Sequence, residues 1–136
     1  MAQLSSDKSA SVHHVELWVG DLGSAEPEWA WLFGQLGWEL YQNWPAGRSW
    51  RAPDGAYVVV EQSPDVEPGP HRRTVPGMNH LALTADRGIV DRIAETGDQH
   101  GWTVLFPDRH PYAGGPEHYA AYLSNSDGFE LELVAR

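Results

Sequence analysis

Two stretches of the chain repeat one alternation of polar and apolar residues. The first spans 12–19 and the second 78–85, and in each a histidine is followed three residues later by a leucine. Because successive strand residues point to opposite faces, both stretches are predicted strands with one apolar face and one face that bears the histidine, His14 or His80. Two copies of one strand predict two copies of one module.

The residues after the first strand predict a helix and three further strands. Apolar residues recur at helical spacing from Trp29 to Leu36, after a turn in which Ser24 is expected to cap the helix. Strands are predicted over 38–43, 48–52 and 56–62, and the last of these is rich in β-branched valine. Module one therefore has the order β-α-β-β-β.

The same order returns after residues 63–77, which are rich in proline and glycine and have no periodicity. A helix is predicted over 88–99, and strands over 103–106, 119–123 and 129–134. The chain thus divides into a flexible leader, residues 1–11, and a single domain over 12–136. Within that domain, module one occupies 12–62, the linker 63–77 and module two 78–135.

Composition and charge restrict the class of function. The chain has 136 residues, enough to bury a core, and no apolar run approaches the roughly 20 residues that cross a bilayer. We expect a soluble, cytoplasmic protein. The absence of cysteine leaves histidine and carboxylate as the side chains for any transition-metal site. A formal charge of -10 argues against nucleic acid or an anionic membrane as partner, so a small molecule is expected.

Four polar residues occupy corresponding places in the two modules. His14 and His80 lie on the first strands, and Glu61 and Glu132 on the last. If both sheets curve around one cavity, two imidazoles and two carboxylates meet there, which suits a divalent metal ion. Glu130 is an alternative to Glu132, since both point to the same side. The neighbour of His14, His13, is instead expected on the covered face.

These features resemble the vicinal oxygen chelate superfamily, which includes glyoxalase I, bleomycin and fosfomycin resistance proteins and extradiol dioxygenases. The resemblance covers about residues 12–135 and depends on the duplicated order, the two His-x-x-Leu openings, and Asp127-Gly128 followed by Glu132. It implies an α+β fold in which two paired βαβββ modules form a half-open β-barrel around a metal-binding cavity. It also implies a homodimer.

The resemblance further implies one divalent metal ion (Ni, Zn, Co, Mn or Fe) with His14, Glu61, His80 and Glu132 as ligands. Glutamate at position 61 is typical of the lyase and isomerase branch of the superfamily. We therefore expect a glyoxalase-like lyase or isomerase that acts on a small carbonyl or enediol-forming metabolite. Either Glu132 or Glu61 would be the catalytic carboxylate that moves the proton.

Aromatic and loop residues are expected to line the cavity and bind substrate: Trp18, Tyr57, Trp50, His110, Tyr112 and His118. Such a lining also suits a non-catalytic protein that sequesters an antibiotic or aromatic natural product, as in bleomycin resistance. An extradiol-type dioxygenase is the third alternative. A fourth metal ligand at Glu61 favours the lyase or isomerase, whereas the abundance of tryptophan favours the sequestering protein.

Overall fold

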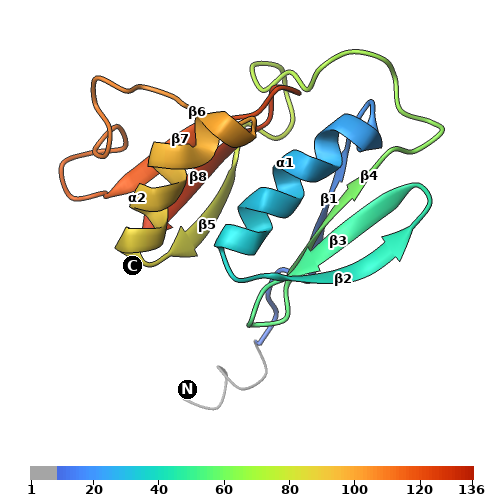
Figure 1. The fold of residues 1–136 in the computed structure, drawn as a ribbon, viewed down its shortest axis with the longest axis horizontal. Helices are drawn as coiled ribbons and strands as arrows, with labels where there is room; N and C mark the ends of the chain where they lie inside the picture. Colours follow the sequence, from blue (N-terminus) through green and yellow to red (C-terminus); the bar gives the residue numbers. More distant parts are fainter. Residues whose placement is uncertain (1–8) are drawn as a thin grey trace.

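The structure, a computed structural model, describes residues 9–136, so residues 1–8 of the expected leader lie outside the described residues (Figure 1). It has two modules, each with the predicted order β-α-β-β-β, and a short 3-10 helix follows the helix of module two. Module one comprises β1 His14–Trp18, α1 Leu22–Gln35, β2 Glu39–Trp44, β3 Gly47–Arg51 and β4 Tyr57–Glu61. Module two comprises β5 Leu81–Ala85, α2 Arg87–Thr96, η2 Gly97–His100, β6 Thr103–Val104, β7 Ala120–Ser124 and β8 Glu130–Ala135.

The two modules have the same sheet topology. Sheet A has the strand order β1-β4-β3-β2, and sheet B has the equivalent order β5-β8-β7-β6. In each sheet the first and last strands of the module pair in parallel, and the other pairs are antiparallel. The result is the α+β, half-open arrangement that was expected, with two four-stranded sheets rather than a closed barrel.

Helix α1 begins three residues earlier than the capping pattern suggested, at Leu22. The cap is Asp21, whose carboxylate accepts a hydrogen bond from the Gly23 backbone N–H at 3.0 Å. The Ser24 hydroxyl bonds back to Asp21 and lies inside the first turn. Pro27 lies inside the helix as its sixth residue, so the Gly23 carbonyl has no N–H donor at position 27.

Both helices cover the same side of the molecule, in front of the two sheets in Figure 1. Under them lies one apolar core that includes residues of both modules. Trp29 of α1 is almost fully buried and contacts Phe33 of its own helix and two rings of module two, Trp102 and Phe129. The Trp102 indole also donates a hydrogen bond to the Glu28 carbonyl at 2.9 Å. The modules are therefore joined through α1.

Two predicted elements of module two differ from those observed. The strand expected over 103–106 is reduced to Thr103–Val104, and the chain then turns at Phe106, which has a positive φ of 53°. The expected helix over 88–99 ends at Thr96 and continues as the 3-10 turn η2. No helix within residues 9–136 has the length and apolar character needed to cross a membrane.

Candidate functional site

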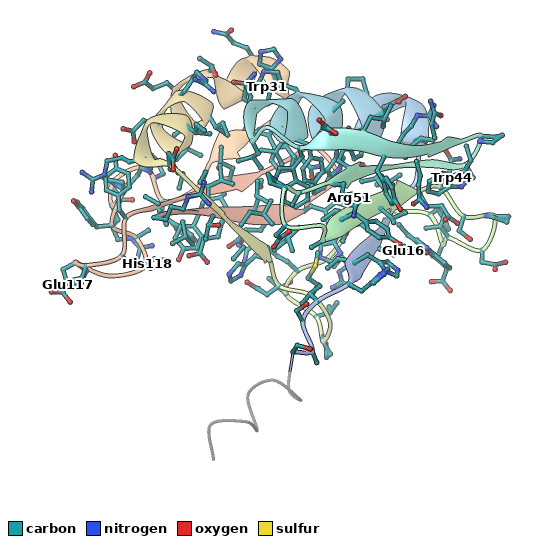
Figure 2. The ribbon with its side chains drawn as sticks, turned by 90° about the horizontal axis from the view of Figure 1, so that it is seen from below. Glu16, Trp31, Trp44, Arg51, Glu117 and His118 are labelled. Atoms are coloured by element: carbon teal, nitrogen blue, oxygen red, sulfur yellow. The ribbon has the colours of Figure 1, made fainter. Side chains whose placement is uncertain are left out.

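Each sheet has one face that the helices leave uncovered, called here the open face. In Figure 2 the helices lie along the top with Trp31, whereas Glu16 and His118 project below the sheets. The alternation of β1 explains this placement, since Leu17 is buried and its neighbours Glu16 and Trp18 are exposed. The chemically reactive side chains of both modules therefore lie on the open faces, Glu16 under sheet A and His118 under sheet B.

On the open face of sheet B, two histidines hold one carboxylate. Nε2 of His80 lies 3.0 Å from Oε1 of Glu132, and Nε2 of His118 lies 2.5 Å from Oε2. The three residues come from different places: the position just before β5, the end of the 105–118 loop, and β8. Glu132 is buried, whereas the imidazoles are partly exposed. A ligand would thus meet the histidines first and the carboxylate behind them.

A second buried carboxylate flanks His80. Glu130 has a relative exposure of 5% and forms an ion pair with Arg73, whose Nε is 3.0 Å from Oε1. Its other oxygen lies 4.0 Å from Nδ1 of His80. Asn79 completes this arrangement, because its amide donates to the Arg73 carbonyl and its oxygen lies 2.8 Å from the same imidazole nitrogen. The ring of His80 is consequently fixed on both edges.

Tyr122 of β7 and the loop glycine Gly114 shape the other side of the site. Tyr122 lies directly opposite Glu132 in the antiparallel pairing. At Gly114 a Cβ atom would meet Cδ2 of His118 at 2.6 Å and the Tyr122 hydroxyl at 2.7 Å. A residue without a side chain is therefore required there for His118 and Tyr122 to approach the loop.

Opposing effects act on the pKa of Glu132. Burial alone would raise this pKa, but hydrogen bonds from His118, Tyr122 and His80 outweigh burial and hold it below its ordinary value. The pKa of the Tyr122 hydroxyl is raised, first by burial and then by the neighbouring Glu132 charge. At neutral pH Glu132 is therefore a carboxylate that accepts hydrogen bonds, and Tyr122 is a neutral donor.

The lowered pKa predicts how stability depends on pH. The ionised Glu132 stabilises the folded state at pH values above its unfolded pKa of 4.5, and this contribution disappears as the pH falls through the lower folded pKa. We expect Glu132→Gln to be less stable than the wild type at neutral pH and the difference to shrink in acid. Urea unfolding at several pH values measures the difference in unfolding free energy, with the exposed Glu117→Gln as control. A difference that grows in acid would contradict a lowered pKa of Glu132 in the folded state.

The structure does not bring His14 and Glu61 to this cluster. The His14 ring stacks on Tyr57, with centroids 4.8 Å apart, and bonds to His13. Strand β4 places Glu61 opposite Trp18, whereas His14 lies opposite Tyr57. His14 and Glu61 line one open hollow of about 400 Å³ on the face of sheet A.

The strand registers explain why Glu61 is not the counterpart of Glu132. In module two, β5 pairs Ala82 with Glu132, and in module one the equivalent pairing joins Glu16 to Val59. The position that corresponds to Glu132 is therefore Val59. Glu61 corresponds to Val134, two residues farther along the strand. The symmetry expected between Glu61 and Glu132 is not observed.

The four predicted metal ligands divide between two places in this structure. Across residues 9–136, no three histidine, aspartate or glutamate side chains are arranged to hold a metal ion. The imidazoles of His80 and His118 bond to opposite oxygens of Glu132, so these donors satisfy one another. The two ligands expected from module one lie instead in the hollow of sheet A.

The other predicted substrate-binding residues divide between the two sides of the sheets. Trp18 and Tyr57 lie on the open face of sheet A, and Trp18 bonds to Glu16 at 2.7 Å. Trp50 is instead a core residue that stacks on Phe33 under α1, because its partner on β4 is the buried Val58.

Two loop histidines that the sequence suggested for the cavity mouth have different surroundings. His118 lies in the site, whereas His110 lines a separate cavity against α2 with Asp91 and Tyr119. Tyr112 is exposed and contacts Tyr119 edge-on. His110 and Tyr112 therefore lie on the helix side, away from Glu132.

Three residues of the site were not among the predicted ones: Tyr122, Arg73 and Asn79. The parity of the predicted strand 119–123 could have indicated Tyr122, because it faces the same side as the glutamates of the last strand. Arg73 lies in the aperiodic linker, where no pattern indicates its position.

Comparisons with known proteins agree with this architecture. A sequence profile of the Glyoxalase/Bleomycin resistance protein/Dioxygenase superfamily matches residues 13–122. The uncharacterized protein YqjT of Bacillus subtilis is 42% identical over 127 residues, which cover 91% of this chain and 98% of that protein.

Solved structures have the same fold. A candidate glyoxalase from Bacillus halodurans superposes with a TM-score of 0.86 at 37% identity, covering 94% of this chain and 97% of the other. A glyoxalase/bleomycin resistance protein from Albidiferax ferrireducens T118 has a TM-score of 0.73 at 22% identity, covering 93% and 99% of the two chains. The second likeness shows the fold alone.

Proposed function

This chain belongs to the glyoxalase/bleomycin resistance protein/dioxygenase superfamily, and on that premise we propose that it is an isomerase or lyase that moves a proton in a small oxygenated metabolite. One observation supports this reaction class: the buried Glu132 carboxylate is held between His80 and His118 at the bottom of an open face. Such a carboxylate can take a proton from a carbon next to a carbonyl group.

The groups around Glu132 suit the two needs of that reaction. Removal of the proton leaves negative charge on the carbonyl oxygen, and hydrogen-bond donors aimed at that oxygen lower the barrier. The imidazoles of His80 and His118 and the hydroxyl of Tyr122 lie beside the base, and on substrate binding these donors would exchange the Glu132 carboxylate for that oxygen. An enediol-forming carbonyl compound is therefore the substrate class that this geometry favours.

Exchange of carbon-bound hydrogen with solvent tests the proposal without knowledge of the natural substrate. Wild-type protein is incubated in D2O with dihydroxyacetone, hydroxyacetone or methylglyoxal, and the signals of hydrogens next to the carbonyl are followed by proton NMR. We expect at least one probe to exchange faster than in buffer. Absence of catalysed exchange for all three would contradict the proposed reaction class.

Metal content provides a separate test of the site geometry. The four-ligand arrangement required Glu61, but Glu61 lies with Trp18 and Gly47 in the strand pairings. We therefore expect Glu61→Ala and wild-type protein to have equal metal content by mass spectrometry after incubation with Ni, Zn, Co, Mn and Fe ions. Loss of a stoichiometric ion in Glu61→Ala alone would restore the four-ligand interpretation.

Sequestration of a ligand without chemistry is the second candidate function. It is favoured by aromatic side chains in module one that remain exposed, with Trp18 at 43% and Tyr41 at 48%. The exchange experiment separates the two candidates, because a sequestering protein would bind its ligand and leave its carbon-bound hydrogens unchanged.

We further propose that the protein acts as a cytoplasmic homodimer. The absence of cysteine supports the location. The dimer is supported by exposed apolar residues such as Val12 and Leu40. It is also supported by the outer edges of β1 and β5, which have no partner strand within residues 9–136. Sedimentation as a single species of 15.1 kDa would contradict the dimer.

A further inference from the structure

The open hollow of sheet A has walls from three strands. Residues of β1, β2 and β4 line about 400 Å³, a volume within the range of small-molecule sites. The buried Val59 forms part of its apolar lining, and Gln42 of β2 is fixed by a hydrogen bond from the Ser49 hydroxyl at 2.9 Å. The hollow thus has a defined shape on the sheet itself.

The charge of the hollow has one sign. Glu16 and Glu61 are carboxylates, and no lysine or arginine is among the residues that line it. Glu16 accepts a hydrogen bond from the Trp18 indole, whereas the side-chain carboxylate of Glu61 has neither a hydrogen bond nor an ion pair with any residue in the described part of the chain. Arg51, on the adjacent strand, lies over the Tyr41 ring at 5.0 Å. Two carboxylates, with no basic residue among the lining, therefore favour a cationic ligand.

Aromatic rings stand beside these carboxylates in fixed orientations. The Trp44 and Tyr57 rings both line the hollow, and one face of each ring is covered, by Gly47 for Trp44 and by the stacked His14 ring for Tyr57. Aromatic faces attract organic cations, and a flanking carboxylate adds a charge partner. A bare metal ion prefers oxygen and nitrogen ligands to aromatic faces. An alkylammonium group, in contrast, interacts favourably with both the aromatic rings and the carboxylate.

From the aromatic walls and unpaired carboxylate we infer that this hollow binds an organic cation, a ligand with an alkylated or primary ammonium group. The inference holds whether the chain catalyses proton transfer at Glu132 or sequesters a ligand. It also gives His14 and Glu61 a shared role in the hollow where they lie. Trp44 and Tyr57 would contact the cation, and Glu61 would supply the countercharge.

A pair of matched probes tests this inference on the full chain. Choline carries a trimethylammonium group, and 3,3-dimethylbutan-1-ol is its neutral carbon isostere. We expect NMR titration at about pH 8, where histidine is mostly neutral, to shift backbone signals of β1, β2 and β4 with choline. The isostere should bind about tenfold more weakly, because it lacks the cation–aromatic and charge terms.

Variants then assign the binding to the hollow. Glu61→Gln should weaken choline binding severalfold, whereas Asp98→Asn, on the exposed turn η2, removes the same charge elsewhere and should leave it unchanged. Tyr57→Leu provides a second test through the aromatic wall. Equal binding of the two probes, equal effects of the two charge variants, shifts confined to other strands, or no saturable shift with choline would each overturn the inference.

Discussion

Glu132→Gln is expected to slow the solvent exchange of a reactive carbonyl probe by about 10²- to 10⁴-fold, the usual contribution of a positioned general base. Glutamine keeps the shape of the side chain and an oxygen near the imidazoles, but an amide does not take a proton from carbon. The loss should therefore appear in the exchange rate, while the fold, followed by circular dichroism, is retained.

The matched control for this experiment is Glu117→Gln. Glu117 is exposed beside His118 (Figure 2), so the variant removes one charge from the same loop without contact with the carboxylate. We expect the control to exchange at the wild-type rate. If Glu132→Gln also retains that rate, Glu132 is not the base and the reaction assigned to this cluster is wrong.

Trp29→Ala is expected to destabilise the fold by about 3–5 kcal/mol, the range for removal of a large buried aromatic side chain. The indole contacts Phe33, Trp102 and Phe129, so its loss opens a cavity where α1 meets module two. Urea unfolding measures this loss in the free energy of unfolding.

Two further tryptophan variants refine the interpretation. Trp31→Ala, on the outer side of the same helix where Trp31 stacks on His100, should cost less than about 1 kcal/mol. Trp29→Phe keeps an aromatic ring and removes an indole N–H that is buried without a partner within residues 9–136, so it should cost far less than alanine. Equal costs for Trp29→Ala and Trp31→Ala would contradict a shared core.

Periodicity was sufficient to predict the fold because each strand has one covered face. The alternation around His14 and His80, the helical stripe from Trp29 and the valine run of β4 each predicted an element that the structure contains. Helix ends were less predictable, since Asp21 and Ser24 are both good caps and tertiary contacts decide between them.

The site was predicted only in part, because the convergence of side chains depends on register and loop course. His80 and Glu132 are in contact, as their positions on neighbouring strands imply. Glu61 follows its turn glycine, Gly55, by six residues, whereas Glu132 follows Gly128 by four. This difference in spacing is the signal in the sequence that the two glutamates are not equivalent.

The register of β1 and β4 would allow a single substitution to make the two halves of this duplicated fold more alike. Strand β4 retains the backbone position that holds a carboxylate in the other half of the molecule, and valine occupies it. Val59→Glu would place a carboxylate near His14 in the same relation that joins Glu132 to His80. One substitution therefore separates the present asymmetric protein from a design in which both halves bear the same pair, with no rearrangement of the main chain.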